Sequence, residues 1–209
     1  MLNNFCSMKT DVAQILLEKK AVKIEPDNPF TWVSGIVSPI YCDNRVLISY
    51  PDAVSVIVLA FKELVENMKF DIIAGVATSG IPWAAFLAYE LDKPMIYVRK
   101  EAKAHGTKSQ IEGVMKKGQK VLLVEDLVST GKSSLEAVNA IRKEGGVCNN
   151  VVGIFQYGFP VADEAFKAEK CSLATITDFP TLLDQLEDID EKKKREVLRF
   201  AENPKEWRK

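Results

Sequence analysis

Two short segments of this chain combine residue types that suit chemistry on a charged, phosphorylated substrate. The first is Val121 to Ser134 (VLLVEDLVSTGKSS), where an apolar run leads into two acids and several hydroxyl side chains. The apolar run predicts a buried strand that delivers Glu125 and Asp126 to the carboxyl edge of a sheet, where ligands bind in open α/β folds. The residues that follow lead into a helix, whose free N–H groups would favour a phosphate.

The acids and the loop predict different contacts. Because carboxylates repel phosphate, Glu125 and Asp126 suit the vicinal hydroxyls of a sugar, or a magnesium ion held through water. Backbone groups from Ser129 to Ser133 could cradle a phosphate. Gly131-Lys132-Ser133 resembles the end of a nucleotide-triphosphate loop, but that pattern requires glycine where this chain has Asp126. The simpler alternative, two acids that only solvate a strand end, does not explain why acids, loop and helix start coincide.

The second segment, residues 99–113 (RKEAKAHGTKSQIEG), has no helical or strand periodicity and is rich in cations. Cations aimed at a leaving diphosphate would stabilise its developing negative charge, and a loop that closes over the substrate would exclude water. Composition alone fits a solvated surface loop equally well. The cationic side chains are Arg99, Lys100, Lys103, His105 and Lys108.

The elements that position these segments alternate between helix and strand patterns, which predicts an α/β fold with a mainly parallel sheet. We expect a first helix from Thr10 or Asp11, and a second that opens at Pro51. Further helices are expected over residues 82–91 and 133–144, and the chain beyond Thr181 reads as a charged helical tail with a solvated face at 191–196. Buried strands are expected at residues 71–77, 95–98, 121–124, 151–155 and 173–176.

The composition of the chain limits its possible domain organisation, binding partners and cellular compartment. The chain has 209 residues, 47% hydrophobic and 27% charged, with a net charge of -1. It predicts a single domain over residues 1–209, divided into an N-terminal helix and hood (1–50), a core (51–176) and a helical tail (177–209). The charge balance predicts no binding to nucleic acid or acidic membranes. The four cysteines form no C-x-x-C pair, and no apolar run approaches 18 residues, so we expect a cytoplasmic protein.

The segment from Val121 to Ser134 closely resembles the signature with which type I phosphoribosyltransferases bind phosphoribosyl pyrophosphate (PRPP). The resemblance implies that Glu125 and Asp126 contact the ribose hydroxyls. The turn Thr78-Ser79-Gly80 resembles the loop with which this family meets the pyrophosphate. The 5′-phosphate would be held by Leu127, Val128, Ser129, Thr130, Gly131, Lys132 and Ser133.

The resemblance of the cationic segment is more specific than that of the segment from Val121 to Ser134. Its R-K-E-x-K-x-H-G order matches the catalytic loop of orotate phosphoribosyltransferases at every fixed position. In that family the loop reaches into the active site of the neighbouring subunit, which implies a homodimer with active sites shared between subunits. Lys103 would be the chief catalytic side chain, joined around the pyrophosphate by Arg99, Lys100 and His105.

Residues 30–45 (FTWVSGIVSPIYCDNR) resemble the segment that covers the base in the same family. Tyr41 would stack on orotate, and Ser129 would contact it. Val33 stands where some members carry a lysine, and residues 155–159 contain no arginine of the kind that holds the orotate carboxylate in some members. Backbone N–H groups or another cation would have to hold that carboxylate.

Together these resemblances imply the type I phosphoribosyltransferase fold, with a mainly parallel central sheet flanked by helices, a small N-terminal hood and a helical C-terminal tail. They imply transfer of the phosphoribosyl group of PRPP to orotate in pyrimidine biosynthesis, with magnesium bound mainly through PRPP and water rather than in a metal site of its own. One alternative is transfer to another base, such as uracil or a purine. A second is a non-catalytic PRPP-binding regulator, which should have lost the cationic loop.

Overall fold

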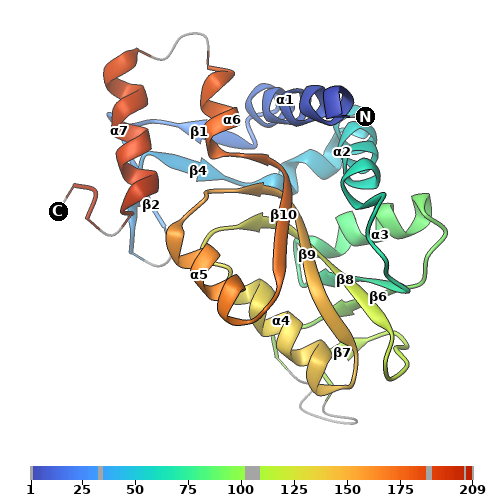
Figure 1. Cartoon of the computed structure of the whole chain (residues 1–209). Helices are drawn as coiled ribbons and strands as arrows, with labels where there is room; N and C mark the ends of the chain where they lie inside the picture. The colour runs from blue at the N-terminus through green and yellow to red at the C-terminus, as the bar shows by residue number, and fades with distance from the viewer. Residues whose placement is uncertain (1, 33–34, 102–108, 187–189, 205, 209) are drawn as a thin grey trace.

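A twisted six-stranded sheet forms the centre of the computed structural model, which describes residues 2–32, 35–101, 109–186, 190–204 and 206–208 (Figure 1). The strand order is β10-β9-β8-β5-β6-β7, and only the β6–β7 pair is antiparallel. This confirms the prediction of a mainly parallel sheet. The strands are β5 (Ile72–Val76), β6 (Met95–Val98), β7 (Ile111–Glu112), β8 (Lys120–Val128), β9 (Val147–Gln156) and β10 (Ser172–Asp178).

Helices cover both faces of this sheet, because its central strands are apolar on both sides. Successive strand residues point to opposite faces, so Ile73 and Leu122 join one hydrophobic cluster while Ile72 and Leu123 join another. The first cluster packs under α1 (Leu2–Glu18), α2 (Pro51–Val65), α3 (Gly80–Glu90), α6 (Phe179–Asp184) and α7 (Glu191–Glu202). The second packs under α4 (Lys132–Lys143) and α5 (Pro160–Ala168).

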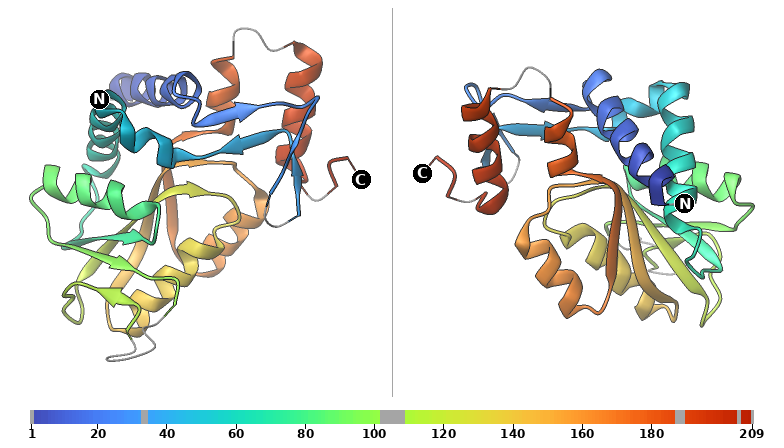
Figure 2. Two further views of the ribbon diagram at one scale, coloured as in Figure 1. Left: turned by 180° about the vertical axis from the view of Figure 1, so that it is seen from behind. Right: turned by 45° about the horizontal axis from the view of Figure 1, so that its top comes forward.

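The N-terminal hood consists of two short hairpins and a 3-10 helix. Strand β1 (Val22–Ile24) pairs with β4 (Ile40–Cys42), and β2 (Phe30–Thr31) pairs with β3 (Val37–Ser38). The 3-10 helix η1 (Asn44–Ser49) then leads into α2. In Figures 1 and 2 the hood lies above the sheet, and α7 stands beside its hairpins.

Three sequence predictions need correction: the start of α1, the end of β8 and the exposure of the C-terminal tail. Helix α1 begins at Leu2 rather than at Thr10 or Asp11, because a nucleated helix extends by one hydrogen bond per added residue without needing a polar cap. Strand β8 continues to Val128, so Glu125 and Asp126 are strand residues rather than the start of a loop. The continuation follows from β9, which pairs with β8 beyond the point where β5 ends.

The tail is helical as predicted, but it is not only a solvated face, since Val197 and Phe200 of α7 are fully buried. The hood strands, β7 and α5 were not predicted. None of the helices in the described ranges combines the length and the apolar character needed to cross a membrane.

Candidate active site

The two acids of β8 lie at the end of the strand in different surroundings. Glu125 is 4% exposed, and its carboxylate accepts hydrogen bonds from the hydroxyls of Ser133 (3.4 Å) and Ser134 (3.3 Å). Burial, with the adjacent charge of Asp126, raises the pKa of Glu125 well above its ordinary value. Burial also raises the pKa of Asp126, against the opposing effect of the Arg45 charge. Glu125 is therefore desolvated and held in place by the start of α4, whereas Asp126 is half-buried beside it.

The loop after β8 turns sharply into α4 at Gly131. Gly131 has φ +77°, and a Cβ there would lie 2.7 Å from the ring of Phe166, so both the backbone and the space require glycine. No side chain caps the N-terminus of α4, which leaves its first N–H groups available. This end of the helix suits an anion.

The turn after β5 approaches the acids closely. A Cβ on Gly80 would lie 2.5 Å from the carbonyl oxygen of Val124, so a larger residue would push the turn away from β8. The contact brings Thr78 and Ser79 beside Glu125 at the carboxyl ends of the parallel strands.

A hollow of about 300 Å³ opens between the hood, this turn, the end of β8 and the start of α4. It unites three of the segments that the sequence singled out: the turn, the acids and the end of the phosphate-type loop. Its lining residues are Cys42, Asp43, Arg45, Val76, Ala77, Thr78, Ser79, Glu125, Asp126, Leu127 and Ser133.

The remaining loop residues have different positions. Val128 is 1% exposed and its side chain packs in the core, so only its backbone can face a ligand. The Lys132 side chain is 81% exposed and extends toward Glu136 at 3.9 Å. Neither side chain lines the hollow, so a phosphate contact from these two positions would be made by the backbone.

Ser129 and Thr130 instead line a second hollow, of about 410 Å³. Tyr41 lines neither hollow; it is 38% exposed and tilts against Phe30, with ring centroids 5.6 Å apart. Of the two residues predicted to contact the base, Ser129 lines the second hollow and Tyr41 does not. The other lining residues of the second hollow are Trp32, Ile36, Phe159, Pro160, Val161, Glu202, Asn203 and Pro204.

The cationic segment is anchored at its base. Arg99 pairs with Glu112 across the β6–β7 hairpin at 3.4 Å, and the side-chain amide of Gln110 donates to the carbonyls of Arg99 and Lys100, each at 3.1 Å. Lys103 and His105 lie outside the described residues, so their predicted roles stay predictions.

Sequence reasoning missed the side chains that end the hood. The guanidinium of Arg45 binds both carboxylate oxygens of Asp43, at 2.6 and 2.7 Å, and this raises the pKa of Arg45. Arg45 is the cation among the described residues that line the first hollow. Asn44 is fully buried and donates to the carbonyl of Asp126 at 2.7 Å. The D-N-R order was visible, but nothing local indicates that it folds against residues some 80 positions away.

The end of β9 is part of an aromatic core. Tyr157 is 3% exposed and stacks on Phe159, with centroids 5.2 Å apart and planes at 8°. Trp32 of the hood lies 5.2 Å from Tyr157, centroid to centroid. A ligand carboxylate therefore has no charged partner at the end of this strand. Within the described ranges, no three or more His, Cys, Asp or Glu residues gather where they could hold a metal ion.

Comparison with known proteins gives consistent matches over most of the chain. Residues 51–155 match the phosphoribosyl transferase domain family. An orotate phosphoribosyltransferase of Coxiella burnetii is 45% identical over 95% of this chain and 97% of its own length. One of Bacillus pumilus is 47% identical over 94% and 95%. The crystal structure of orotate phosphoribosyltransferase from Aeropyrum pernix superposes with a TM-score of 0.75 at 32% identity, covering 83% of this chain and 97% of that one.

Proposed function

Because this chain belongs to the phosphoribosyl transferase family, as one of its orotate phosphoribosyltransferases, we propose how its described residues carry the reaction. The protein has the type I phosphoribosyltransferase fold. It transfers the phosphoribosyl group of PRPP to orotate and yields orotidine 5′-phosphate and pyrophosphate, a step of pyrimidine biosynthesis. The residue assignments below are our proposal.

The first hollow is the PRPP site. Its supporting observation is that one cavity gathers the 78–80 turn, the paired acids and the start of α4. Glu125 and Asp126 bind the ribose hydroxyls, because a carboxylate accepts hydrogen bonds from hydroxyls and repels phosphate. Backbone N–H groups of residues 127–133 bind the 5′-phosphate at the N-terminus of α4. The turn Thr78–Gly80 binds the pyrophosphate.

Arg45 adds a positive charge to this site. PRPP brings phosphate charge into a hollow that already contains Asp43, Glu125 and Asp126, so a resident cation is needed to offset the repulsion. Asp43 binds Arg45 through two hydrogen bonds and so fixes the direction of the guanidinium. We assign Arg45 to the diphosphate of PRPP.

The chemical step exchanges one bond for another at the anomeric carbon. The bond from this carbon to the pyrophosphate oxygen breaks, and its electron pair leaves with pyrophosphate. A ring nitrogen of orotate forms the new bond from the opposite face, and its proton passes to the departing pyrophosphate or to water. The nearby carboxylates stabilise positive charge on the ribose, and the cations Arg99, Lys100, Lys103 and His105, with Lys103 foremost, stabilise the leaving group.

Orotate lies beneath the hood, with Ser129 as its contact from the phosphate loop and Tyr41 as its contact from β4. Ser129 lines the second hollow, beside Trp32 of the hood, which supports a base site on this side of the hood. Since the end of β9 is packed with aromatic rings, backbone N–H groups or a cation elsewhere hold the orotate carboxylate.

Magnesium fits the described residues as an ion that enters with PRPP. The acids of the first hollow do not gather as a metal site among the described residues, and the Glu125 carboxylate already accepts hydrogen bonds from Ser133 and Ser134. When bound to PRPP oxygens and water, magnesium would neutralise charge on the diphosphate. Asp126, whose carboxyl lines the hollow, is the residue we expect to reach its water shell.

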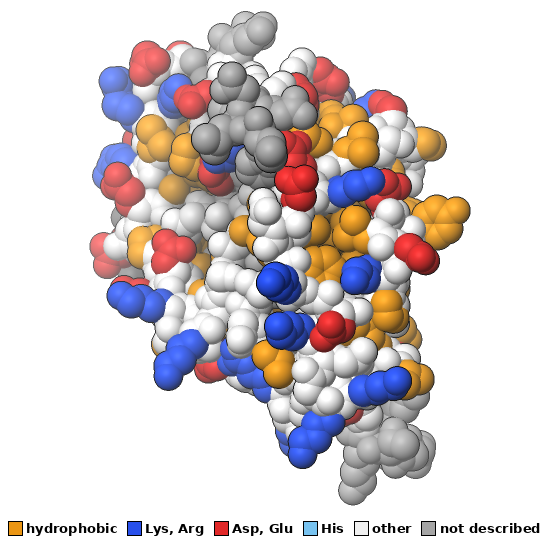
Figure 3. All heavy atoms as spheres, turned by 45° about the vertical axis from the view of Figure 1, so that its right-hand side comes forward, with side chains coloured by type: hydrophobic (Ala, Val, Ile, Leu, Met, Phe, Trp, Pro, Cys, Tyr) orange, Lys and Arg blue, Asp and Glu red, His pale blue; other side chains and the backbone are white. Residues whose placement is uncertain are grey.

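The protein acts as a homodimer in which the segment at 99–113 of one subunit serves the site of the other. This segment leaves the sheet at its β6–β7 edge, next to α3, so a partner should dock on that side. Large apolar side chains are exposed there, with Leu59 of α2 at 51% and Tyr89 of α3 at 91%. Figure 3 shows hydrophobic side chains grouped with Lys and Arg on this face.

Each subunit forms a single domain, supported by one cluster that holds residues from Val12 to Trp207. We place the protein in the cytoplasm, where the free thiols of Cys42, Cys148 and Cys171 would stay reduced.

The first test is an absorbance assay with PRPP, magnesium and orotate, run beside uracil, adenine and hypoxanthine. We expect orotate to be consumed only when both PRPP and magnesium are present. Turnover of another base instead would contradict the substrate assignment. Measurable PRPP binding without turnover of any base would point to a regulator.

A further inference from the structure

The C-terminal tail is joined to the hood at three separate places. Lys193 of α7 forms an ion pair with Asp27 at 2.8 Å. The guanidinium of Arg208 donates to the carbonyl oxygen of Pro26 at 2.5 Å. The ring of Phe200 meets the indole of Trp32 edge-on, with centroids 5.7 Å apart and planes at 86°. The first contact is at the surface and the second is partly buried, whereas the third joins the fully buried Phe200 ring to the half-buried Trp32.

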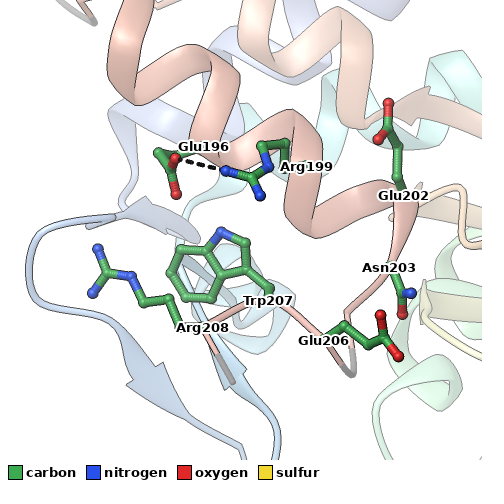
Figure 4. Close-up of a pocket in the computed structure, with 7 residues that line it drawn as sticks. All are labelled: Glu196, Arg199, Glu202, Asn203, Glu206, Trp207 and Arg208. Atoms are coloured by element: carbon green, nitrogen blue, oxygen red, sulfur yellow. Dashed lines mark hydrogen bonds and ion pairs between the residues drawn. The ribbon is translucent and has the colours of Figure 1, made fainter.

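Phe200 is the centre of the buried contact. It is 0% exposed, and it also meets Phe159 and Trp207 edge-on, at 5.8 and 5.7 Å between centroids. Figure 4 shows Trp207 on the same side of α7 as Glu196 and Arg199, while Glu202 and Asn203 lie on the other side of the helix end. All five residues line one pocket at the end of α7, and Glu202 and Asn203 also line the second hollow.

Trp32 transmits this contact to the strand that carries Tyr41. Its indole N–H donates to the carbonyl oxygen of Ile40 at 3.2 Å, and its backbone N–H donates to the carbonyl of Ile36 at 2.9 Å. Trp32 therefore ties the β2–β3 hairpin to β4. A shift of Phe200 would move the indole, and with it the backbone next to Tyr41.

The polar end of the tail faces the second hollow. Glu202, Asn203 and Pro204 line this hollow together with Trp32 and Ser129. The described lining of the first hollow, by contrast, comes from the hood, the 78–80 turn, β8 and α4, and includes no residue of α7. The tail thus shares a hollow with Trp32 and Ser129, and it does not line the hollow that contains the paired acids.

We propose that α7 positions the hood for the base, with Phe200 acting through Trp32 as a positioning residue that determines the affinity for orotate. The inference rests on the proposed function, in which orotate lies beneath the hood. It requires that loss of the Phe200 ring weakens orotate binding and leaves PRPP binding nearly unchanged.

The test compares Phe200→Ala with Leu198→Ala, which removes an exposed side chain (39%) from the same helix. Initial rates are measured with orotate and PRPP varied in turn. We expect Phe200→Ala to raise KM for orotate about tenfold, which is the effect of about 1.4 kcal/mol. KM for PRPP should change less than about twofold and kcat should be nearly retained, since KM alone rises when uniform binding is lost. Phe200→Leu should recover much of the loss, and Leu198→Ala should resemble the wild-type enzyme.

Trp32→Phe serves as a second variant, because it keeps an aromatic ring while it removes the N–H donor to Ile40 and part of the ring volume. If circular dichroism shows that Phe200→Ala does not fold, Trp32→Phe tests the inference in its place. A selective rise in KM for orotate in Trp32→Phe supports the inference. Equal changes in both KM values, or an unchanged KM for orotate, would overturn it. Failure of the wild-type protein to consume orotate would instead overturn the proposed function.

Discussion

The side-chain amide of Asn44 donates a 2.7 Å hydrogen bond to the backbone carbonyl of Asp126, and so joins the end of the hood to the strand that carries the paired acids. Asn44 is fully buried. The bond links two segments that are 82 residues apart in the chain. It also explains why Arg45, the next residue, lines the same hollow as the acids.

Replacing Asn44 with alanine should destabilise the fold and weaken PRPP binding. The substitution leaves a buried carbonyl without its partner, which typically costs about 1–3 kcal/mol. Urea unfolding would measure this loss, and KM for PRPP would report the displaced hood. Asn67→Ala, at an exposed position, is the matched control. A variant as stable as the wild type would show that the bond does not hold the hood in place.

Glu125→Gln should change how stability depends on pH. The folded-state pKa of Glu125 is raised by burial and by Asp126, so in acid the carboxyl is protonated in both folded and unfolded chains. As the pH rises past about 4.3, the unfolded chain loses this proton first, and stability falls until the folded carboxyl also ionises. Glutamine cannot ionise and avoids this fall.

The stability of Glu125→Gln relative to the wild type should therefore grow as the pH rises above about 4.3 in urea titrations. Turnover should fall in the same variant, because the amide is a poorer acceptor for the ribose hydroxyls. The exposed Glu164→Gln is the control. An advantage that stays constant or shrinks with pH would contradict the direction of the pKa shift.

Arg45→Ala should raise KM for PRPP about tenfold or more, because a charge-assisted contact to the diphosphate is lost. Arg45→Lys should recover only part of the affinity, since an ammonium group cannot form the two parallel hydrogen bonds to Asp43. Steady-state kinetics would measure both effects. Lys69→Ala removes one exposed charge near the opposite ends of the strands and should leave KM unchanged.

Lys103→Ala and Asp126→Asn should each lower turnover by about two to three orders of magnitude while the fold stays intact. If sites are shared between subunits, mixing the two variants under subunit exchange should restore about a quarter of the wild-type activity. This follows because half of the dimers are mixed and each mixed dimer rebuilds one of its two sites. The double variant mixed with Lys103→Ala is the control. No recovery, with exchange verified, would mean that each subunit completes its own site.

The sequence by itself determined the elements whose signals are local. Apolar runs specify β5, which is buried on both faces, and β6, whose residues alternate between half-buried and buried. Pro51 specifies the start of α2, and Gly145 the end of α4. The placement of the acids and of the loop before α4 was also predictable, because both belong to a single continuous segment.

Only the tertiary structure decided which distant residues contact the segment from Val121 to Ser134. The extension of β8 through Glu125 and Asp126 depends on its pairing with β9, and the place of Arg45 depends on the bond between Asn44 and Asp126. The packing of Phe200 on Trp32 converts a tail that reads as solvated into a support for the hood. These contacts join residues far apart in the chain, and their free energy comes from close packing and burial, which no local pattern encodes.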